Sequence, residues 1–221
     1  MNISAAMETR KSIRAYLDQP VPREVIEAIL EKALRSPSAT NIQPWNIYVV
    51  TGEVLERIKK ENLELFHAGI RPTIEEPELT GPFKERRREL AIDLFNLLGI
   101  KREDREKRRD WTARGHNYFD APAALILTTS NYAAGGTWSL LGIGSLLQSI
   151  CLAALESDLG TCVSEQGVSY HEVLRKHLGI PQEENIVISI AMGYPDPDHP
   201  ANKLISKREP LDRVTHWFGF E

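Results

Sequence analysis

The stretch from Trp138 to Leu155 constrains the fold of this chain more than any other segment. It is apolar nearly all the way round a helix and is nearly long enough to span a bilayer. Small and polar residues interrupt it, among them Ser139, Gly142 and Gln148. A helix of this kind more often fills a protein core or a subunit interface than a membrane. We therefore expect other elements, or a second copy of the chain, to cover it.

Length and charge favour a single globular domain over residues 1–221, because a chain of this size can bury a sizeable core. The net charge is −4 and the isoelectric point is about 5.9, so a general nucleic-acid or membrane binder is disfavoured and any anion site must be local. The N-terminal sequence has neither the basic nor the apolar region of a signal peptide. Together with the two cysteines, this predicts a cytoplasmic protein without a disulfide.

Hydrophobic periodicity predicts helices that alternate with a few strands. The predicted strands are 46–50, 123–129 and 185–192. The predicted helices are 3–16, 22–36, 53–65, 83–109, the apolar stretch with a glycine cap near Gly160, and 168–178. Residues 66–80 and 160–167 are predicted loops, the first of them mobile, and the mixed charges of 101–110 favour a solvated helix face. The aromatic tail after residue 198 is expected to dock, on a partner subunit. The order indicates an α+β layer fold.

Two short basic clusters lie near the two ends of this acidic chain. The first, Arg10 to Arg14, offers two guanidinium groups, an ammonium and a hydroxyl within one turn of chain, and the second holds Lys207 and Arg208. Guanidinium groups bind phosphate oxygens through paired hydrogen bonds. If the clusters meet in space, a phosphate-bearing cofactor is the simplest reason. Taken alone, the first cluster is better explained as a solvated helix end.

Two further segments could face the flat ring of such a cofactor. Residues 36–45 place turn-forming, hydrogen-bonding and aromatic side chains between a helix and a strand, and residues 160–167 are flexible enough to lie along a ring. An ordinary polar loop explains the first segment equally well, and for residues 160–167 taken alone a plain loop is the better explanation. Other chemistries are disfavoured: the chain has no Walker or Gly-x-Gly-x-x-Gly motif, its histidines lack metal-ligand spacing, and Cys162 with His171 has no evident third group for a thiol nucleophile.

In this order the segments resemble the FMN-dependent nitroreductase family. The resemblance rests on RKSIRAY near the start, SPSATNIQPWNIYVVTG, FDAPAALIL, LLQSICLAALESDLGTC, LGIP, MGYPD and KREPLD. It covers most of the chain and is weakest from about residue 61 to residue 112. The stretches GTWSLLGIGSLLQ and LGTC, Asn202 and the closing WFGF look most like the members that reduce nitrobenzoate and nitrobenzene.

The resemblance implies a nitroreductase-like fold and a tightly bound FMN. The fold would be a homodimer with a central, mostly antiparallel sheet flanked by helices, in which a domain-swapped C-terminal tail wraps the other subunit. The residues implied to bind FMN are Arg10, Lys11, Ser12, Arg14, Pro37, Ser38, Ala39, Asn41, Arg114, Asn117, Glu165, Gln166, Gly167, Lys207 and Arg208. The basic clusters would hold the phosphate and ribityl chain, residues 37–41 would come from the other subunit, and Arg114 and Asn117 would contact the pyrimidine edge.

Two positions depart from the family pattern. Lys11 stands where many members have a second arginine, and it still supplies a positive charge. Residues 164–167 read Ser-Glu-Gln-Gly where well-known members have Pro-x-Glu-Gly. Either Glu165 or Gln166 could therefore stand next to flavin N5.

The implied activity is ping-pong reduction of nitroaromatic compounds by NADH or NADPH, with the flavin rather than a protein acid or base performing the chemistry. Residues 61–112 are expected to form a variable lid, and Phe83, Trp111 and Trp138 are candidates to stack on the substrate or to serve as core or interface aromatics. Three alternatives stay open. One is reduction of quinones, enones or halogenated phenols, another is a flavin-binding protein without turnover, and the last is an anion-binding interaction protein without flavin.

Overall fold

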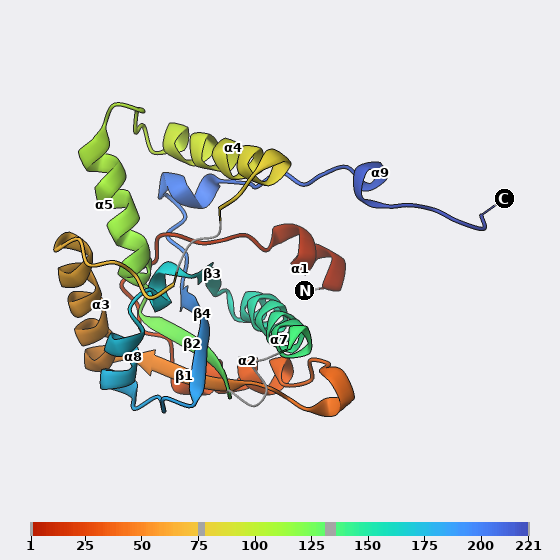
Figure 1. Ribbon diagram of the computed structural model, residues 1–221, viewed down its shortest axis with the longest axis horizontal. Coiled ribbons are helices and arrows are strands. Elements are labelled where there is room, and N and C mark those ends of the chain that lie inside the picture. The colour runs from red at the N-terminus through yellow and green to blue at the C-terminus, as the bar shows by residue number, and fades with distance from the viewer. Residues whose placement is uncertain (1, 75–77, 131–135, 221) are drawn as a thin grey trace.

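The molecule is built on a four-stranded sheet with helices on both faces (Figure 1). The computed structural model describes residues 2–74, 78–130 and 136–220. The strands, each antiparallel to its neighbours in the order β1-β2-β4-β3, are β1 (Asn46–Thr51), β2 (Ala123–Ser130), β3 (Gly160–Ser164) and β4 (Glu184–Gly193). The predicted α+β class and its strands are confirmed. The loop predicted over 160–167 is wrong, because residues 160–164 pair with β4.

Strand β2 divides the interior into two cores. Side chains alternate between the faces of a strand. Accordingly, Ala124 and Ile126 join one apolar cluster, while Leu125 and Leu127 join the other. All four are fully buried. A strand covered on both faces reads as a continuous apolar run, which is why the sequence identified it.

Helices cover both faces of the sheet. One core includes side chains of α3 (Gly52–His67), α5 (Arg105–His116) and α8 (His171–Leu178), and the other is closed by α2 (Arg23–Ala33) and α7 (Thr137–Ala154). The shorter α1 (Ile3–Thr9) and α9 (Leu211–Val214) and the longer α4 (Gly81–Leu97) lie outside these layers. The predicted start of α8 at residue 168 is three residues early, because a short 3₁₀ turn, Gln166–Val168, precedes the helix.

The predicted first helix, 3–16, is wrong beyond Thr9. Residues 10–16 are extended and touch the sheet edge through bridges of Ser12 to Thr161 and of Tyr16 to Pro195. Ile13 and Ala15 are buried, two residues apart, on the inward side of this segment. That period of two is the signature of an extended segment.

The predicted long helix over 83–109 is two helices. α4 ends at Leu97, and Gly99 follows with φ 65°, a left-handed conformation that glycine adopts without steric cost. The loop predicted over 66–80 begins only after α3 ends at His67, and residues 75–77 lie outside the described residues. Leu94 of α4 is buried against Ala201 and Leu204. Helix α4, which belongs to the predicted lid, therefore rests on the segment that leads into the tail.

Helix α7 is the apolar helix that the sequence predicted. Its inner side chains, including Leu146 and Ile150, are buried against the sheet and α2, whereas Trp138 and Leu141 on its outer side are exposed. Within the described residues it is the one helix whose length and composition would allow a membrane crossing, but its inner side packs as a core helix does. The chain turns at Asp158, with φ 56°, and not at the predicted glycine.

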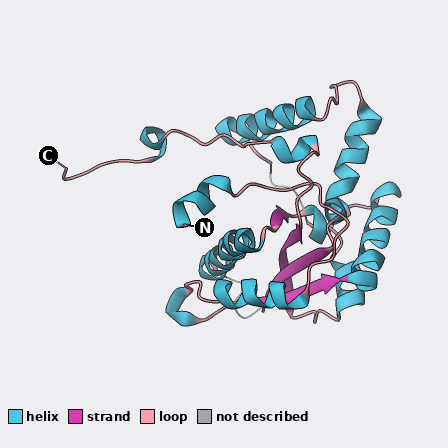
Figure 2. Cartoon of the chain, turned by 180° about the vertical axis from the view of Figure 1, so that it is seen from behind, coloured by secondary structure: helices cyan, strands magenta, loops and turns pink. Residues whose placement is uncertain are grey.

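After Leu204 the chain leaves the body of the molecule. Figure 2 shows the tail, with the short α9, extending away from the sheet and its helices. Its large apolar side chains are exposed, and Phe218 retains 86% of its accessible surface. These exposed residues are Ile205, Leu211, Val214, Trp217, Phe218 and Phe220.

Candidate functional site

An extended segment and an edge strand run side by side at the first part of the candidate site. Ser12 bridges Thr161 in parallel, and the amide of Ile13 donates to the carbonyl of Thr161 over 2.9 Å. The first basic cluster therefore follows β3 from its beginning towards its end, with its cationic side chains half-buried. A cavity of about 430 Å³ opens where β3 begins. Its charged lining residues are Arg10, Lys11, Asp158, Asp196 and Lys203.

Asn202 fixes the basic segment in place. This side chain is buried, and its Oδ1 accepts from the amide of Arg14 over 2.7 Å. Its Nδ2 donates to the carbonyls of Ala15 and Asp196, both over 2.8 Å. One amide side chain thus satisfies three backbone groups on two segments far apart in sequence. The resemblance singled out Asn202, but this contact was not foreseen.

The two cysteines lie close to the basic segment and are not activated. Burial raises the pKa of the Cys162 thiol, although the Arg14 charge and a hydrogen bond from Ser12 oppose that shift. Burial likewise raises the pKa of Cys151. A nucleophilic thiol needs a lowered pKa, and both cysteines are buried and free. The charge of Arg14 therefore reaches β3 without creating a thiolate there.

At its other end, β3 runs into a turn, residues 165–167, held from the core side. The Ser189 hydroxyl donates to the Ser164 carbonyl over 2.5 Å, and the Tyr118 hydroxyl donates to the Gly167 carbonyl. Only glycine fits at 167, because a Cβ there would lie 2.3 Å from Ser189 Oγ and 2.6 Å from Tyr118 Cε1. The core thus fixes the path of the turn, and Glu165 stays exposed at its outer side.

A second cavity, of about 470 Å³, adjoins this turn and has aromatic walls. The His116 ring is buried between Phe66 and Tyr170, with centroid distances of 4.7 Å and 5.7 Å. Burial lowers the pKa of His116, and a backbone hydrogen bond with Gln166 opposes the shift. A neutral imidazole is therefore favoured. Glu165 and Gln166 line the cavity too, so the turn closes one of its sides.

A left-handed turn connects α5 to β2 beside this cavity. Tyr118, Phe119 and Asp120 have φ of 52°, 55° and 63°, a conformation that costs an L-residue about 1–2 kcal/mol. The turn places Tyr118 behind Gly167 and lets Asp120 pair with Arg114, with 3.1 Å between the guanidinium and the carboxylate. Asn117 also donates to Asp120. Strained backbone of this kind gathers at functional sites.

The buried Nε of Arg114 has no hydrogen-bond partner among the described residues. A buried donor left without an acceptor is costly, and an acceptor on a bound ligand would relieve that cost. Arg114 and Asn117 therefore lie together beside the turn, tied to the same aspartate. The sequence nominated both; it did not indicate Asp120, His116 or Tyr118.

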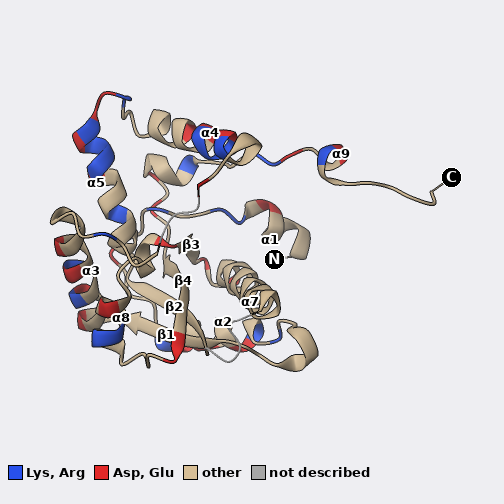
Figure 3. Cartoon of the chain, viewed as in Figure 1, with Lys and Arg blue, Asp and Glu red and all other residues tan. Residues whose placement is uncertain are grey.

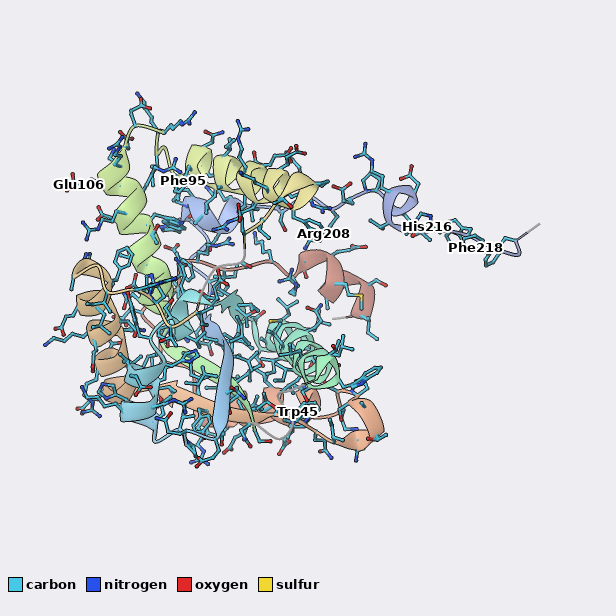
Figure 4. All side chains as sticks on the ribbon, in the orientation of Figure 1. Trp45, Phe95, Glu106, Arg208, His216 and Phe218 are labelled. Atoms are coloured by element: carbon cyan, nitrogen blue, oxygen red, sulfur yellow. The ribbon has the colours of Figure 1, made fainter. Side chains whose placement is uncertain are left out.

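The two tail residues predicted to bind the phosphate, Lys207 and Arg208, contact other groups than the first basic cluster. Lys207 pairs with Asp93 of α4 over 3.4 Å. Arg208 donates to the Ser206 hydroxyl over 2.7 Å and to two backbone carbonyls of its own segment. Figure 4 shows Arg208 on the outgoing tail, between α4 and α9. Both side chains are exposed.

The predicted loop 36–45 lies on the other side of α7 from the tail. Figure 4 shows Trp45 near α2, far from Arg208. The loop is held by a hydrogen bond of 3.0 Å from the Gln43 amide to Ser38 Oγ and by Pro44, which packs on Gly142 of α7. The segment that holds Pro37, Ser38, Ala39 and Asn41 therefore lies apart from the tail cations within one subunit.

The three candidate stacking aromatics lie on three different helices. Phe83 on α4 and Trp138 on α7 are exposed, and the Arg86 guanidinium lies 5.0 Å from the Phe83 ring centroid. Trp111 on α5 is half-buried, with its ring centroid 6.1 Å from that of Phe119 and 6.3 Å from that of His199. The packing of Trp111 fits the alternative of a core aromatic.

The two cavities lie at the two ends of β3, whose five residues span about 16 Å. Three cations and two carboxylates line the first cavity, and aromatic rings line the second, while the buried Arg114 Nε lies on α5 outside the described lining of either cavity. The arrangement suits a ligand with an anionic group at one end and a flat ring at the other.

Comparison with known proteins points to one family. The sequence profile described as the Nitroreductase family matches residues 7–194. A 4-nitrobenzoate reductase of Nocardioides sp. (strain LMS-CY) is 34% identical over 95% of this chain and 87% of its own. A nitrobenzene nitroreductase of Ectopseudomonas oleovorans is 35% identical over 96% of this chain and 95% of its own.

The fold has a similarly close match among solved structures. The crystal structure of the FMN- and NADPH-dependent nitroreductase NfnB from Sphigopyxis sp. strain HMH superimposes with a TM-score of 0.93. The match covers 100% of both chains at 32% sequence identity.

Proposed function

This chain belongs to the nitroreductase family, and we propose that it is an FMN-dependent oxidoreductase that reduces nitroaromatic compounds with electrons from NADH or NADPH. The observation that carries the proposal is the pair of cavities joined by β3, the first beside the basic segment, with Arg10, Lys11 and Lys203 in its lining, and the second walled by aromatic rings. FMN has the matching shape, a phosphate joined by a chain to a flat ring. The relatives named for nitrobenzoate and nitrobenzene reduction support the substrate class.

The residues at the cationic end would hold the phosphate and the ribityl chain. Arg10, Lys11, Ser12 and Arg14 supply cations and a hydroxyl on a segment that Asn202 keeps extended. Paired guanidinium hydrogen bonds suit phosphate oxygens. Lys207 and Arg208 would complete this set from the tail.

The residues at the aromatic end would orient the ring. Glu165, Gln166 and Gly167 would lie along its edge and face, because the core fixes the path of that turn. The buried Nε of Arg114, with Asn117 beside it, would meet the acceptors of the pyrimidine edge. Residues Pro37, Ser38, Ala39 and Asn41 would approach from the second subunit.

When bound, FMN would supply the chemistry of accepting a hydride and passing electrons to a substrate. The chain would contribute position and exclusion of water, through the rings of Phe66, His116 and Tyr170 that wall the second cavity. His116 favours its neutral form, so we assign no catalytic acid or base to the protein.

A homodimer with an exchanged tail is part of the proposal. The outer side of α7 and the tail together expose Trp138, Leu141, Trp217, Phe218 and Phe220. Exposed apolar surface on this scale marks an interaction site. Burying the tail on a second copy would cover both surfaces and bring residues 37–41 of one subunit to the site of the other.

The lid and the cellular setting follow from the same proposal. Within the single domain 1–221, residues 61–112 would form the lid, because the end of α3, the segment 69–74 and the last turns of α5 line the aromatic cavity. Phe83, Trp111 and Trp138 remain the proposed aromatics around the substrate. The cytoplasm suits the two free thiols.

An absorbance spectrum of the purified protein tests the function. The protein should be yellow, should bleach when NADH or NADPH is added without oxygen, and should regain its colour when 4-nitrobenzoate follows. A protein that bleaches but ignores nitroaromatics would move the substrate class to quinones, enones or halogenated phenols. A colourless protein that FMN cannot reconstitute would contradict the proposal.

A further inference from the structure

A strongly basic cavity lies outside the groove along β3, between α4, α5 and the turn that joins them. Its volume is about 980 Å³, which is at the upper end for small-molecule pockets. Glu78 is the one acid in its described lining. Its basic lining residues are Lys84, Arg87, Arg88, Lys101, Arg102 and Arg108. Figure 3 shows this gathering of Lys and Arg on α4 and α5.

Helix geometry separates these cations from those that face the tail. Lys84, Arg88 and Phe95 recur at helical spacing and share one face of α4. Arg86, on another side of the helix, pairs with Glu209 over 3.3 Å. No ion pair with a described carboxylate neutralises Lys84, Arg88, Lys101 or Arg102.

The concentration of charge is unusual for this chain. Its net charge is −4, and cations held together repel one another unless an anion compensates them. The sequence favoured a solvated helix face for residues 101–110. Most of those side chains are exposed, as that interpretation requires, but the turn at Gly99 also folds the segment back against α4, so cations from both sides of the turn line one cavity.

The cavity also has apolar walls suited to a flat ring. Ile92, Phe95 and Ile100 line it, and the Arg108 guanidinium lies 4.3 Å from the Phe95 ring centroid. Nucleotide bases stack on aromatic and guanidinium planes, while Lys and Arg bind phosphates. A phosphorylated adenine nucleotide combines both requirements.

Helix α5 connects this cavity to the aromatic cavity beside β3. Arg108 lines the first, and Thr112 and His116, one and two turns further along, line the second. At the rise of an α-helix, Arg108 and His116 are about 12 Å apart along the axis. A dinucleotide whose halves are joined by a pyrophosphate can extend between cavities at this spacing.

We propose that the basic cavity binds the adenosine 2′-phosphate half of NADPH while the nicotinamide half reaches the aromatic cavity. The inference rests on the proposed function for its electron donor, and it makes α4 and α5 a specificity element. The pyrophosphate and the 2′-phosphate would together compensate the cations that no described acid neutralises.

Steady-state kinetics of the Arg88→Gln/Arg102→Gln double variant test the proposal. KM for NADPH should rise about 5- to 20-fold, since charge-assisted hydrogen bonds to partly exposed groups are lost. KM for NADH should rise less, and kcat should stay the same. The rate with N-benzyl dihydronicotinamide, which lacks phosphates, should not change. An unchanged KM for NADPH, or an equal loss with the benzyl donor, overturns the proposal.

A matched control carries the same charge change elsewhere. Arg35→Gln/Arg57→Gln removes two exposed guanidinium groups after α2 and on α3, and it should leave all three donors unaffected. Calorimetry with adenosine 2′,5′-bisphosphate provides a readout that needs no flavin turnover. The wild-type protein should bind it and the Arg88/Arg102 variant should bind it at least about fivefold more weakly. If the protein binds the bisphosphate but cannot be reconstituted with FMN, this inference stands and the proposed function fails. If the wild-type protein does not bind the bisphosphate, this inference is overturned.

Discussion

Residues 10–14 and residues 206–208 are both proposed to supply cations to the FMN site, but the fold holds them in different ways. The first segment lies along β3, and its backbone is bonded to the buried Asn202 side chain. The second is exposed, with Lys207 paired to α4 and Arg208 bonded to its own neighbours. One half of the proposed cofactor site is thus set by the folding of a single chain, and the other depends on where the tail goes.

Mutations in the half formed by residues 10–14 (the fixed half) and mutations in the tail should therefore have different effects. A change in the fixed half should act on stability and cofactor affinity in every assembly state. A change in the tail should act through the second subunit, because within one chain the tail contacts little beyond α4.

Removal of residues 205–221 should have the largest effect. The truncated chain should lose dimer mass in light scattering and should not retain FMN, because the apolar tail and both tail cations are gone. Its far-UV circular dichroism should remain close to wild type, since the four-residue α9 is the one described element that the truncation removes. A truncated chain that stays dimeric and yellow would refute the exchange of tails.

Phe218→Ser is the milder counterpart of the truncation. It keeps Lys207 and Arg208 but removes one exposed aromatic. If dimerisation weakens while FMN affinity at high protein concentration is retained, the apolar tail and the tail cations have separable roles.

Asn202→Ala should be the most damaging single substitution in the fixed half. It leaves the Arg14 amide and the Asp196 carbonyl without their partner and the Ala15 carbonyl with the Asp196 amide alone, at a cost of about 3 kcal/mol in the free energy of unfolding. For a chain of this size that corresponds to about 6–12 °C in Tm. Thermal unfolding checks it, with exposed Asn46→Ala as the control. A Tm within about 2 °C of wild type would show that Asn202 does not fix the segment.

The fold was predictable where burial is periodic within one element. The run 123–129 reads as a strand because both of its faces are covered, and the apolar stretch that became α7 reads as a helix by length and composition. Residues 10–16 and 160–164 were assigned wrongly together. Residues 160–164 are extended because they pair with β4, and residues 10–16 are extended because they lie along the edge that β3 forms, so both depend on contacts far away in the sequence.

The candidate site divides in the same way. Arg10, Arg14 and Arg114 could be nominated because they stand in recognisable segments. His116, Tyr118 and Asp120 could not, because their roles arise from contacts with Gln166, Gly167 and Arg114 that no local pattern marks. The basic cavity was missed for the same reason: it needs the break at Gly99.

Arg10→Ala and Arg208→Ala should each weaken FMN binding about tenfold, since each removes a charge-assisted hydrogen bond. Because residues 10–14 are held within one chain and the tail depends on the second subunit, the FMN affinities of the two variants should respond differently when the protein is diluted. The loss in Arg10→Ala should be the same at all protein concentrations, whereas the contribution of Arg208 should vanish once the dimer dissociates. Fluorescence titration of FMN checks both, and an unchanged affinity in both variants would contradict the site assignment.

The smallest effect concerns the pH dependence of the fixed half. Burial lowers the pKa of His116 in the folded chain. On acidification the unfolded chain therefore takes up a proton near pH 6.5, while the folded chain takes it up only at lower pH. The stability that the neutral ring contributes is present above the unfolded pKa and is lost as the pH falls through the folded pKa.

His116→Phe keeps a ring between Phe66 and Tyr170 and removes the titration. The decrease in Tm from about pH 7.5 to about pH 5.5 should be smaller in this variant than in wild type, and the exposed His67→Gln control should behave as wild type. The difference should persist in the tail-truncated chain, because His116 lies in the body; if truncation removed it, the aromatic end of β3 would belong to the tail-dependent half instead.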